Sequence, residues 1–120
     1  MLENFWNIYV NVLKNKYFLF DGRTSRREYW SFFLINLLII IAISIIDGLF
    51  ETNGFIGGIY SLALLLPNLG LSVRRLHDLG KSGWLLLLGL IPLVGVILLL
   101  IWFVGEGQPN ANEYGEVPTV

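Results

Sequence analysis

The chain has 120 residues, of which 55% are apolar and 14% charged, with a formal net charge of −1. Soluble proteins carry about 25% charged residues, so this composition excludes an ordinary soluble domain and favours a single membrane domain, residues 1–120. The chain has no cysteine, which excludes disulfides, thiolate metal sites and cysteine nucleophiles.

Residues 1–20 predict an amphipathic helix. Asn4, Asn7 and Asn11 recur at helical spacing, and Tyr9 and Val12 belong to the opposite, apolar face. The segment is too polar to cross a bilayer, so we expect it to lie in the inner membrane interface. A frayed polar tail is the alternative.

Three long runs without charge follow, at residues 29–46, 55–73 and 84–104. At about 1.5 Å per residue each is roughly 27–31 Å long as a helix, close to the ~30 Å hydrocarbon layer of a bilayer. The sequence therefore predicts an all-α integral membrane protein with three transmembrane helices, preceded by the interfacial helix and followed by a polar tail at 105–120.

The basic residues set the expected orientation. All eight lie either before the first run or between the second and third, whereas residues 47–54 and the tail contain acids but no Lys or Arg. Cationic segments close to a span stay on the cytoplasmic side. Three spans then place the N-terminus in the cytoplasm and the C-terminus on the periplasmic or extracellular side.

Two juxtamembrane stretches contain most of these cations. Residues 22–30, the first motif, read GRTSRREYW, and residues 74–84, the second motif, read RRLHDLGKSGW. Ser25 and Glu28 have the spacing of a capping box for the first span, and Ser82 is a candidate cap for the third. Trp30 and Trp84 stand near span ends, where indole rings prefer the headgroup level.

Both motifs, with a looser match at residues 112–115 (NEYG), resemble the small bacterial inner-membrane family called domain of unknown function 805, the YhaH type. The family pattern has GRxSRxEYW before the first span and RRLHDxGxSGW before the last. The resemblance implies a multi-pass protein of the bacterial inner (plasma) membrane. It implies no activity, because none is established for the family.

The motif cations predict a cradle for a lipid phosphate at the inner surface, since guanidinium groups bind phosphate oxygens bidentately. Its expected members are Arg23, Arg26, Arg27, Arg74, Arg75, His77 and Lys81. The structural motif residues are Ser25, Glu28, Trp30, Asp78, Ser82 and Trp84. The alternative is that the arginines only set topology and pair with Glu28 and Asp78.

We expect no catalytic residues, metal or cofactor. One histidine cannot build a multi-histidine metal centre, and nothing in the sequence marks a nucleophile for His77. Neighbouring residues on a helix point about 100° apart, so Asp78 is not expected to orient His77. The cations are explained by topology, which argues against nucleic acid as a partner.

Two amides fall inside the predicted spans. Asn36 and Asn68 come to one depth if the first two helices are antiparallel, where a mutual hydrogen bond would align the helices. Pro67 frees the carbonyl of Ala63 and predicts a kink in the second helix. Pro92 falls within the third predicted span.

The sequence favours a non-enzymatic module that binds anionic lipid headgroups or a partner protein at its cytoplasmic face. The expected partners are membrane lipids, together with a homo-oligomer or another inner-membrane protein. The alternatives are a component of an oligomeric transporter or channel and, less favoured, a lipid-phosphate enzyme centred on His77.

Overall fold

The computed structural model describes residues 2–118, and its regular elements are helical in that range. They are α1 (Leu2–Asn15), α2 (Arg26–Leu49), α3 (Phe55–Ala63), α4 (Leu65–Asp78), the 3₁₀ helix η1 (Gly83–Leu90) and α5 (Val94–Val104). The all-α prediction is confirmed.

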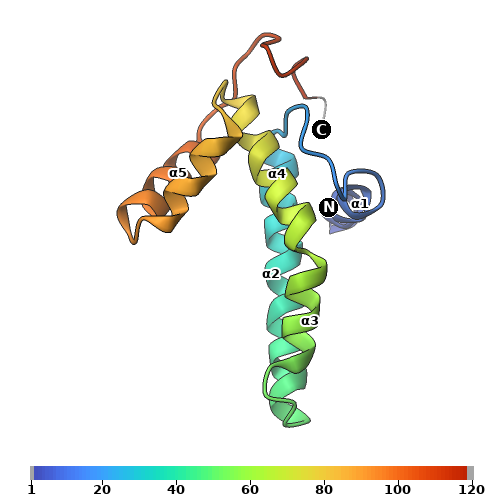
Figure 1. Ribbon diagram of the computed structural model, residues 1–120. Coiled ribbons are helices and arrows are strands. Elements are labelled where there is room, and N and C mark those ends of the chain that lie inside the picture. Colours follow the sequence, from blue (N-terminus) through green and yellow to red (C-terminus); the bar gives the residue numbers. More distant parts are fainter. Residues whose placement is uncertain (1, 119–120) are drawn as a thin grey trace.

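The long axis of the molecule is formed by α2 and the α3–α4 pair, which lie side by side (Figure 1). Ser25 begins α2 as predicted, because its hydroxyl accepts a hydrogen bond from the Glu28 amide at 3.1 Å. Within the described residues α2 is the one unbroken helix long and apolar enough to cross a membrane, and its 24 residues measure about 36 Å. The α3–α4 pair is a second candidate span if it is counted as one bent helix.

The bend between α3 and α4 is 47° and has a local cause. Pro67 has no N–H, so the carbonyl of Ala63 four residues earlier loses its helical partner. The hydroxyl of Tyr17, in the loop after α1, donates to that carbonyl instead. The predicted kink is therefore present, and the carbonyl that it frees is satisfied from outside the helix.

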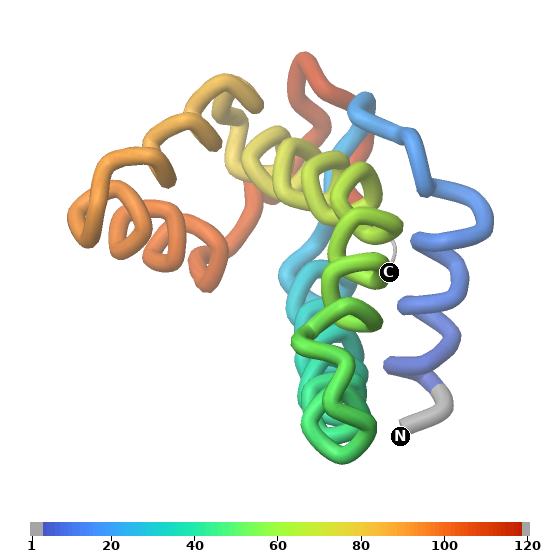
Figure 2. Tube along the Cα trace, turned by 60° about the horizontal axis from the view of Figure 1, so that its bottom comes forward, coloured from blue at the N-terminus to red at the C-terminus, as the bar shows by residue number. Residues whose placement is uncertain are grey.

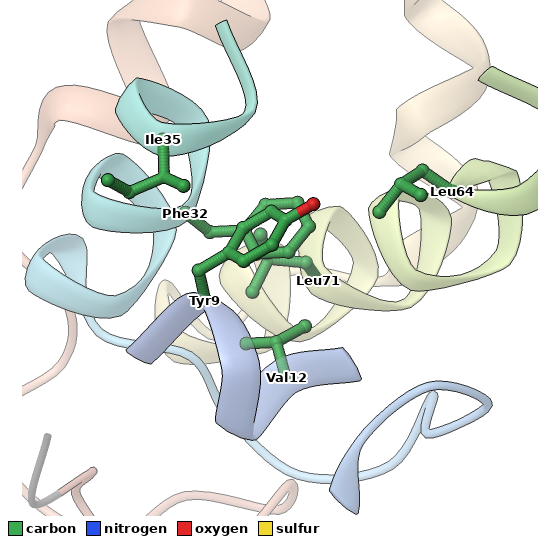
Figure 3. Close-up of a cluster of buried hydrophobic side chains, with 6 residues drawn as sticks. All are labelled: Tyr9, Val12, Phe32, Ile35, Leu64 and Leu71. Carbon is green, nitrogen blue, oxygen red and sulfur yellow. The ribbon is translucent and has the colours of Figure 1, made fainter. Parts of the chain in front are cut away.

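The amphipathic helix α1 crosses the α2–α4 pair. In Figure 1 α1 is seen nearly end-on, whereas α2 runs from top to bottom; Figure 2 shows α1 from its side. Its apolar face is buried against the long helices in a cluster that Figure 3 shows, made of Tyr9, Val12, Phe32, Ile35, Leu64 and Leu71. An orientation across the long helices is the one an interfacial helix requires.

The predicted third span is wrong as a single helix. Residues 84–104 form η1 and α5, which pack against each other as a hairpin with Ile91 and Pro92 at its tip. Leu93 turns the chain with φ at +65°. At Gly95 a Cβ would lie 1.6 Å from the carbonyl oxygen of Leu88, so only glycine allows this approach of α5 to η1.

The hairpin is too short to cross a bilayer. Eight residues of 3₁₀ helix and eleven of α-helix each measure about 16 Å, roughly half of a ~30 Å hydrocarbon layer. Both of its ends lie at the end of the molecule where α4 stops and α2 begins. The tail that follows α5 (residues 105–118) crosses this same end (Figure 1).

Candidate functional site

The two motifs meet around one buried carboxylate, that of Asp78. Its Oδ1 accepts from Nε of Arg23 at 3.0 Å, and its Oδ2 accepts from Nη1 of Arg75 at 2.8 Å. The three side chains are at most 5% exposed. We call them the arginine cluster. Breaking such a buried set leaves an uncompensated charge, which makes each member expensive to remove.

The remaining donors of the cluster bind backbone carbonyls from the C-terminal part of the chain. Arg75 Nε donates to the Phe103 carbonyl at 3.2 Å, and the indole N–H of Trp30 donates to the same oxygen at 3.0 Å. Arg75 also donates to Gly105. These are the unsatisfied carbonyls at the negative end of α5, where a cation is favourable.

Arg23 binds the tail further along. Its Nη2 donates to the Gln108 carbonyl at 2.6 Å, and its Nη1 donates to the carbonyls of Asn110 and Gly115 at 2.8 and 3.3 Å. At Gly107 a Cβ would lie 1.9 Å from Asp78 Oδ2, so the tail backbone lies directly on the cluster. Arg23 and Arg75 therefore bind the chain's own oxygens in the places where a phosphate was expected.

Arg74 lies on another side of α4 and is also buried. Its Nε donates to the Gly70 carbonyl at 3.2 Å, and its charge is within electrostatic reach of Glu28. Glu28, buried in the first turn of α2, accepts from Lys16 Nζ at 2.6 Å. This pair joins the end of α1 to the start of α2, so Glu28 has a structural partner as well as its place in the helix cap.

His77 connects α4 to the first motif and to the tail. Its Nδ1 lies 2.9 Å from the Gly22 carbonyl and must carry a proton, because a carbonyl only accepts. Its ring stacks on that of Tyr114, with centroids 3.9 Å apart and planes within 1°. Asp78 faces the arginines instead, which confirms that it does not orient His77.

Tyr114 is held in the tail by a small turn. Asn112 and Gly115 exchange backbone hydrogen bonds at 3.0 Å, and the Asn112 side chain donates to the His77 carbonyl at 2.9 Å. Burial and the neighbouring Glu113 carboxylate raise the pKa of the Tyr114 phenol. The phenol therefore stays neutral while it stacks on the imidazole.

The other predicted cations are more exposed. Arg26 has a side chain 50% exposed, with one guanidinium nitrogen 3.8 Å from the Glu106 carboxylate. Arg27 is exposed on the first turn of α2. Lys81 Nζ lies 4.7 Å from the centre of the Trp102 ring, a cation–π contact. The structure thus divides the predicted cradle into buried arginines that hold the fold and outer cations that are more exposed.

A cavity of about 630 Å³ opens between α4 and η1, next to this cluster; we call it the groove. Ser82 caps η1 at the mouth of the groove, accepting from the Trp84 amide at 3.3 Å, and Trp84 is 80% exposed beside it. The lining is mostly apolar and comes from α4, η1 and two aromatic residues: Phe20, Leu69, Val73, His77, Ser82, Gly83, Trp84, Leu86, Leu87, Gly89, Leu90 and Tyr114.

The two amides inside the predicted spans do not pair with each other in the described chain. Asn36 accepts instead from the hydroxyl of Tyr60 at 2.6 Å, and that hydroxyl lies 2.8 Å from the hydroxyl of Tyr9. Asn68 is half-buried on α4. The Tyr9–Tyr60–Asn36 chain of hydrogen bonds therefore joins α1, α3 and α2.

No group of three or more metal-ligating side chains occurs among residues 2–118 that the structure describes. Sequence reasoning missed two contacts of the tail: its backbone carbonyls on the arginine cluster, and Tyr114 on His77. The NEYG match and the glycines at 105 and 107 were the available signals, but carbonyl acceptors have no sequence signature.

Comparisons with known proteins agree with the motifs. Residues 17–116 match the family described as protein of unknown function (DUF805). The inner membrane protein YhaI of Escherichia coli K12 is 41% identical over 111 residues, covering 92% of this chain and 93% of the relative. The inner membrane protein YhaH of the same strain is 35% identical over 115 residues, covering 92% and 94%. No solved structure gives a significant match to the chain.

Proposed function

The chain belongs to the DUF805 family of proteins of unknown function, and we propose that it is a non-enzymatic inner-membrane module that binds anionic lipid headgroups at its cytoplasmic face. The observation that carries the proposal is the pair of exposed arginines on the first turn of α2, next to the end of an amphipathic helix that lies across the long helices. The Lys16–Glu28 ion pair fixes that neighbourhood. Cations at this level attract anionic lipids.

The proposal places both termini in the cytoplasm. Two crossings, α2 and the bent α3–α4 pair, and a hairpin that returns to its side of entry leave the motifs and tail on one surface. The eight basic residues all belong to that surface, which agrees with the bias of cations toward the cytoplasm. This arrangement replaces the expected periplasmic C-terminus, which required residues 84–104 to cross as one helix.

Arg26 and Arg27 are the residues proposed to contact headgroups. The buried arginines are not available for this role, because the Asp78 carboxylate and the tail carbonyls occupy Arg23 and Arg75. Arg26 is partly neutralised by Glu106, whereas Arg27 has no ion-pair partner in the described part of the chain. Lys14, also exposed, ends the polar face of α1 nearby in the sequence.

The test is competitive lipid retention. The protein is extracted from vesicles of equal phosphatidylglycerol and phosphatidylethanolamine, and the lipids that stay bound are quantified by mass spectrometry. Arg26→Gln with Arg27→Gln should lower the preference for phosphatidylglycerol roughly tenfold, because each cation near the surface is worth about 1 kcal/mol and Arg26 is already partly neutralised.

The matched control is Arg26→Lys with Arg27→Lys, which keeps the charge and should keep the preference. A folded Gln variant that retains phosphatidylglycerol as the unchanged protein does would refute headgroup binding by these residues.

A further inference from the structure

The groove between α4 and η1 has two apolar walls. Leu69 and Val73 of α4 form one wall, and Leu86 and Leu90 of η1 form the other. Leu90 is 80% exposed and Leu69 is 38% exposed, so the groove is open at its side and not sealed in the core. Its volume of about 630 Å³ falls within the ~300–1,000 Å³ range of ligand sites.

The polarity of the groove changes along its length. His77, Ser82 and Tyr114 line the end near the arginine cluster, and leucines line the other. From His77 to Leu69 is about 12 Å of α-helix, and from Ser82 to Leu90 is about 16 Å of 3₁₀ helix. That length is about half of a ~30 Å hydrocarbon layer, the depth of one leaflet.

The shape and polarity of the groove favour one kind of occupant. The groove is open along its side, about as long as one leaflet is deep, apolar over most of its lining and polar at one end. A phospholipid acyl chain has the same features, because its hydrocarbon length ends in a polar ester and a phosphate.

The polar end offers groups suited to a lipid's ester region. The Ser82 hydroxyl accepts from the Trp84 amide and keeps its own proton to donate. His77 uses Nδ1 on the Gly22 carbonyl, which leaves Nε2 for another partner. These groups lie where the proposed function positions the headgroups. His77 belongs to α4, and Arg26 and Arg27 belong to the neighbouring helix α2.

We infer that the groove holds one acyl chain of an inner-leaflet phospholipid, with its ester and phosphate region at Ser82 and His77. The inference rests on the proposed function for the position of this surface in the membrane. It adds a second contact to the lipid: the groove recognises the acyl chain, and the exposed arginines recognise the charge of the headgroup.

The experiment counts phospholipids that survive delipidation. The full chain is reconstituted in vesicles of phosphatidylethanolamine and phosphatidylglycerol, and is then extracted and washed in dodecyl maltoside. Native mass spectrometry measures the mass of the protein with the phospholipids that remain bound. We expect one retained phospholipid per chain. Leu69→Trp, which fills the groove, should reduce the retained fraction at least tenfold, whereas Leu62→Trp, at an exposed position of α3 outside the groove, should leave it unchanged.

Val73→Phe provides a second groove variant, and circular dichroism confirms that each variant is folded. The inference is overturned if the unchanged protein retains no phospholipid, if folded Leu69→Trp or Val73→Phe retains as much as the unchanged protein, or if the Leu69→Trp change instead separates a dimer that carries no lipid. Failure of the proposed function looks different: the Arg26 and Arg27 variants then keep their headgroup preference while the count at the groove still responds to Leu69→Trp.

Discussion

Asp78→Asn is the change that should most destabilise the end of the molecule where α4 stops and α2 begins. Asparagine keeps the volume of the side chain but removes the charge that faces Arg23 and Arg75, whose side chains are 1% and 0% exposed. Removing one partner of a buried ion pair costs about 3–5 kcal/mol, because a buried charge is left uncompensated. Native proteins are stable by only about 5–15 kcal/mol, so this is a large fraction of the total.

Glu106→Gln is the matched control. Its carboxylate lies 3.8 Å from Arg26, but the two side chains are 84% and 50% exposed. Exposed ion pairs contribute about 0–1 kcal/mol. Both variants remove one acid that faces an arginine of the first motif, and they differ in burial.

Thermal unfolding in detergent and cleavage by a glutamate-specific protease measure the effect. Asp78→Asn should lower Tm by roughly 10–20 °C, whereas Glu106→Gln should lower it by no more than about 4 °C. The Asp78 variant should also expose the Glu113 and Glu116 peptide bonds of the tail to cleavage. Equal shifts in Tm for the two variants, or a tail equally protected in both, would refute the assignment of Asp78 as the centre of the cluster.

Three further predictions concern the hairpin, the bend and the tail. Gly95→Ala should unfold or displace the hairpin, because its Cβ would lie 1.6 Å from the Leu88 carbonyl oxygen. The control is Gly58→Ala, which should be tolerated because nothing lies within 4 Å of its Cβ. Cross-linking of cysteines placed in η1 and α5 measures whether the hairpin is intact in each variant. Tyr17→Phe should lower the free energy of unfolding by about 0.5–1.5 kcal/mol, measured by denaturant titration, because the Ala63 carbonyl loses its donor. The raised pKa of Tyr114 means that its contribution to stability is fully present below the unfolded-state pKa of about 10 and is lost as pH rises through the higher folded value. The absorbance change that reports ionisation of this phenol, obtained by comparison with Tyr114→Phe, should therefore appear above pH 10.

The helix starts and the kink could be predicted because their causes are local. Ser25 and Ser82 were recognised as caps from residue types within a few positions, and both hydroxyls accept the expected amides. Pro67 predicts a freed carbonyl because proline has no N–H to donate. The donor to that carbonyl, Tyr17, lies 46 residues away, and no local pattern points to it.

The third run is not one helix, although its length and apolarity are those of a span. In residues 84–104, Gly89, Pro92 and Gly95 recur within seven positions in the middle of the run. Glycine and proline at that density favour a turn between two short helices. An apolar run indicates that a segment is removed from water; whether it crosses a membrane depends on where its two ends are held.

Of the cations predicted to lie together, the structure joins Arg23 and Arg75 at Asp78, but their partners could not be read from the sequence. Charge and spacing bring Arg23 and Arg75 to one membrane level, and a phosphate is the usual ligand there. Carbonyls at the end of α5, at the negative end of its helix dipole, bind Arg75 in its place, and carbonyls of the tail backbone bind Arg23. Backbone acceptors are the same for every residue type, so only the fold could reveal them.

Labelling of single cysteines tests most directly that the hairpin returns the chain to its side of entry. The natural chain has no cysteine, so Ala111→Cys in the tail and Phe50→Cys in the loop between α2 and α3 each provide one thiol, both at exposed positions. In intact spheroplasts a membrane-impermeant maleimide should label Phe50→Cys at once and should label Ala111→Cys only after lysis. Labelling of Ala111→Cys before lysis would contradict the shared cytoplasmic surface of the motifs and the tail.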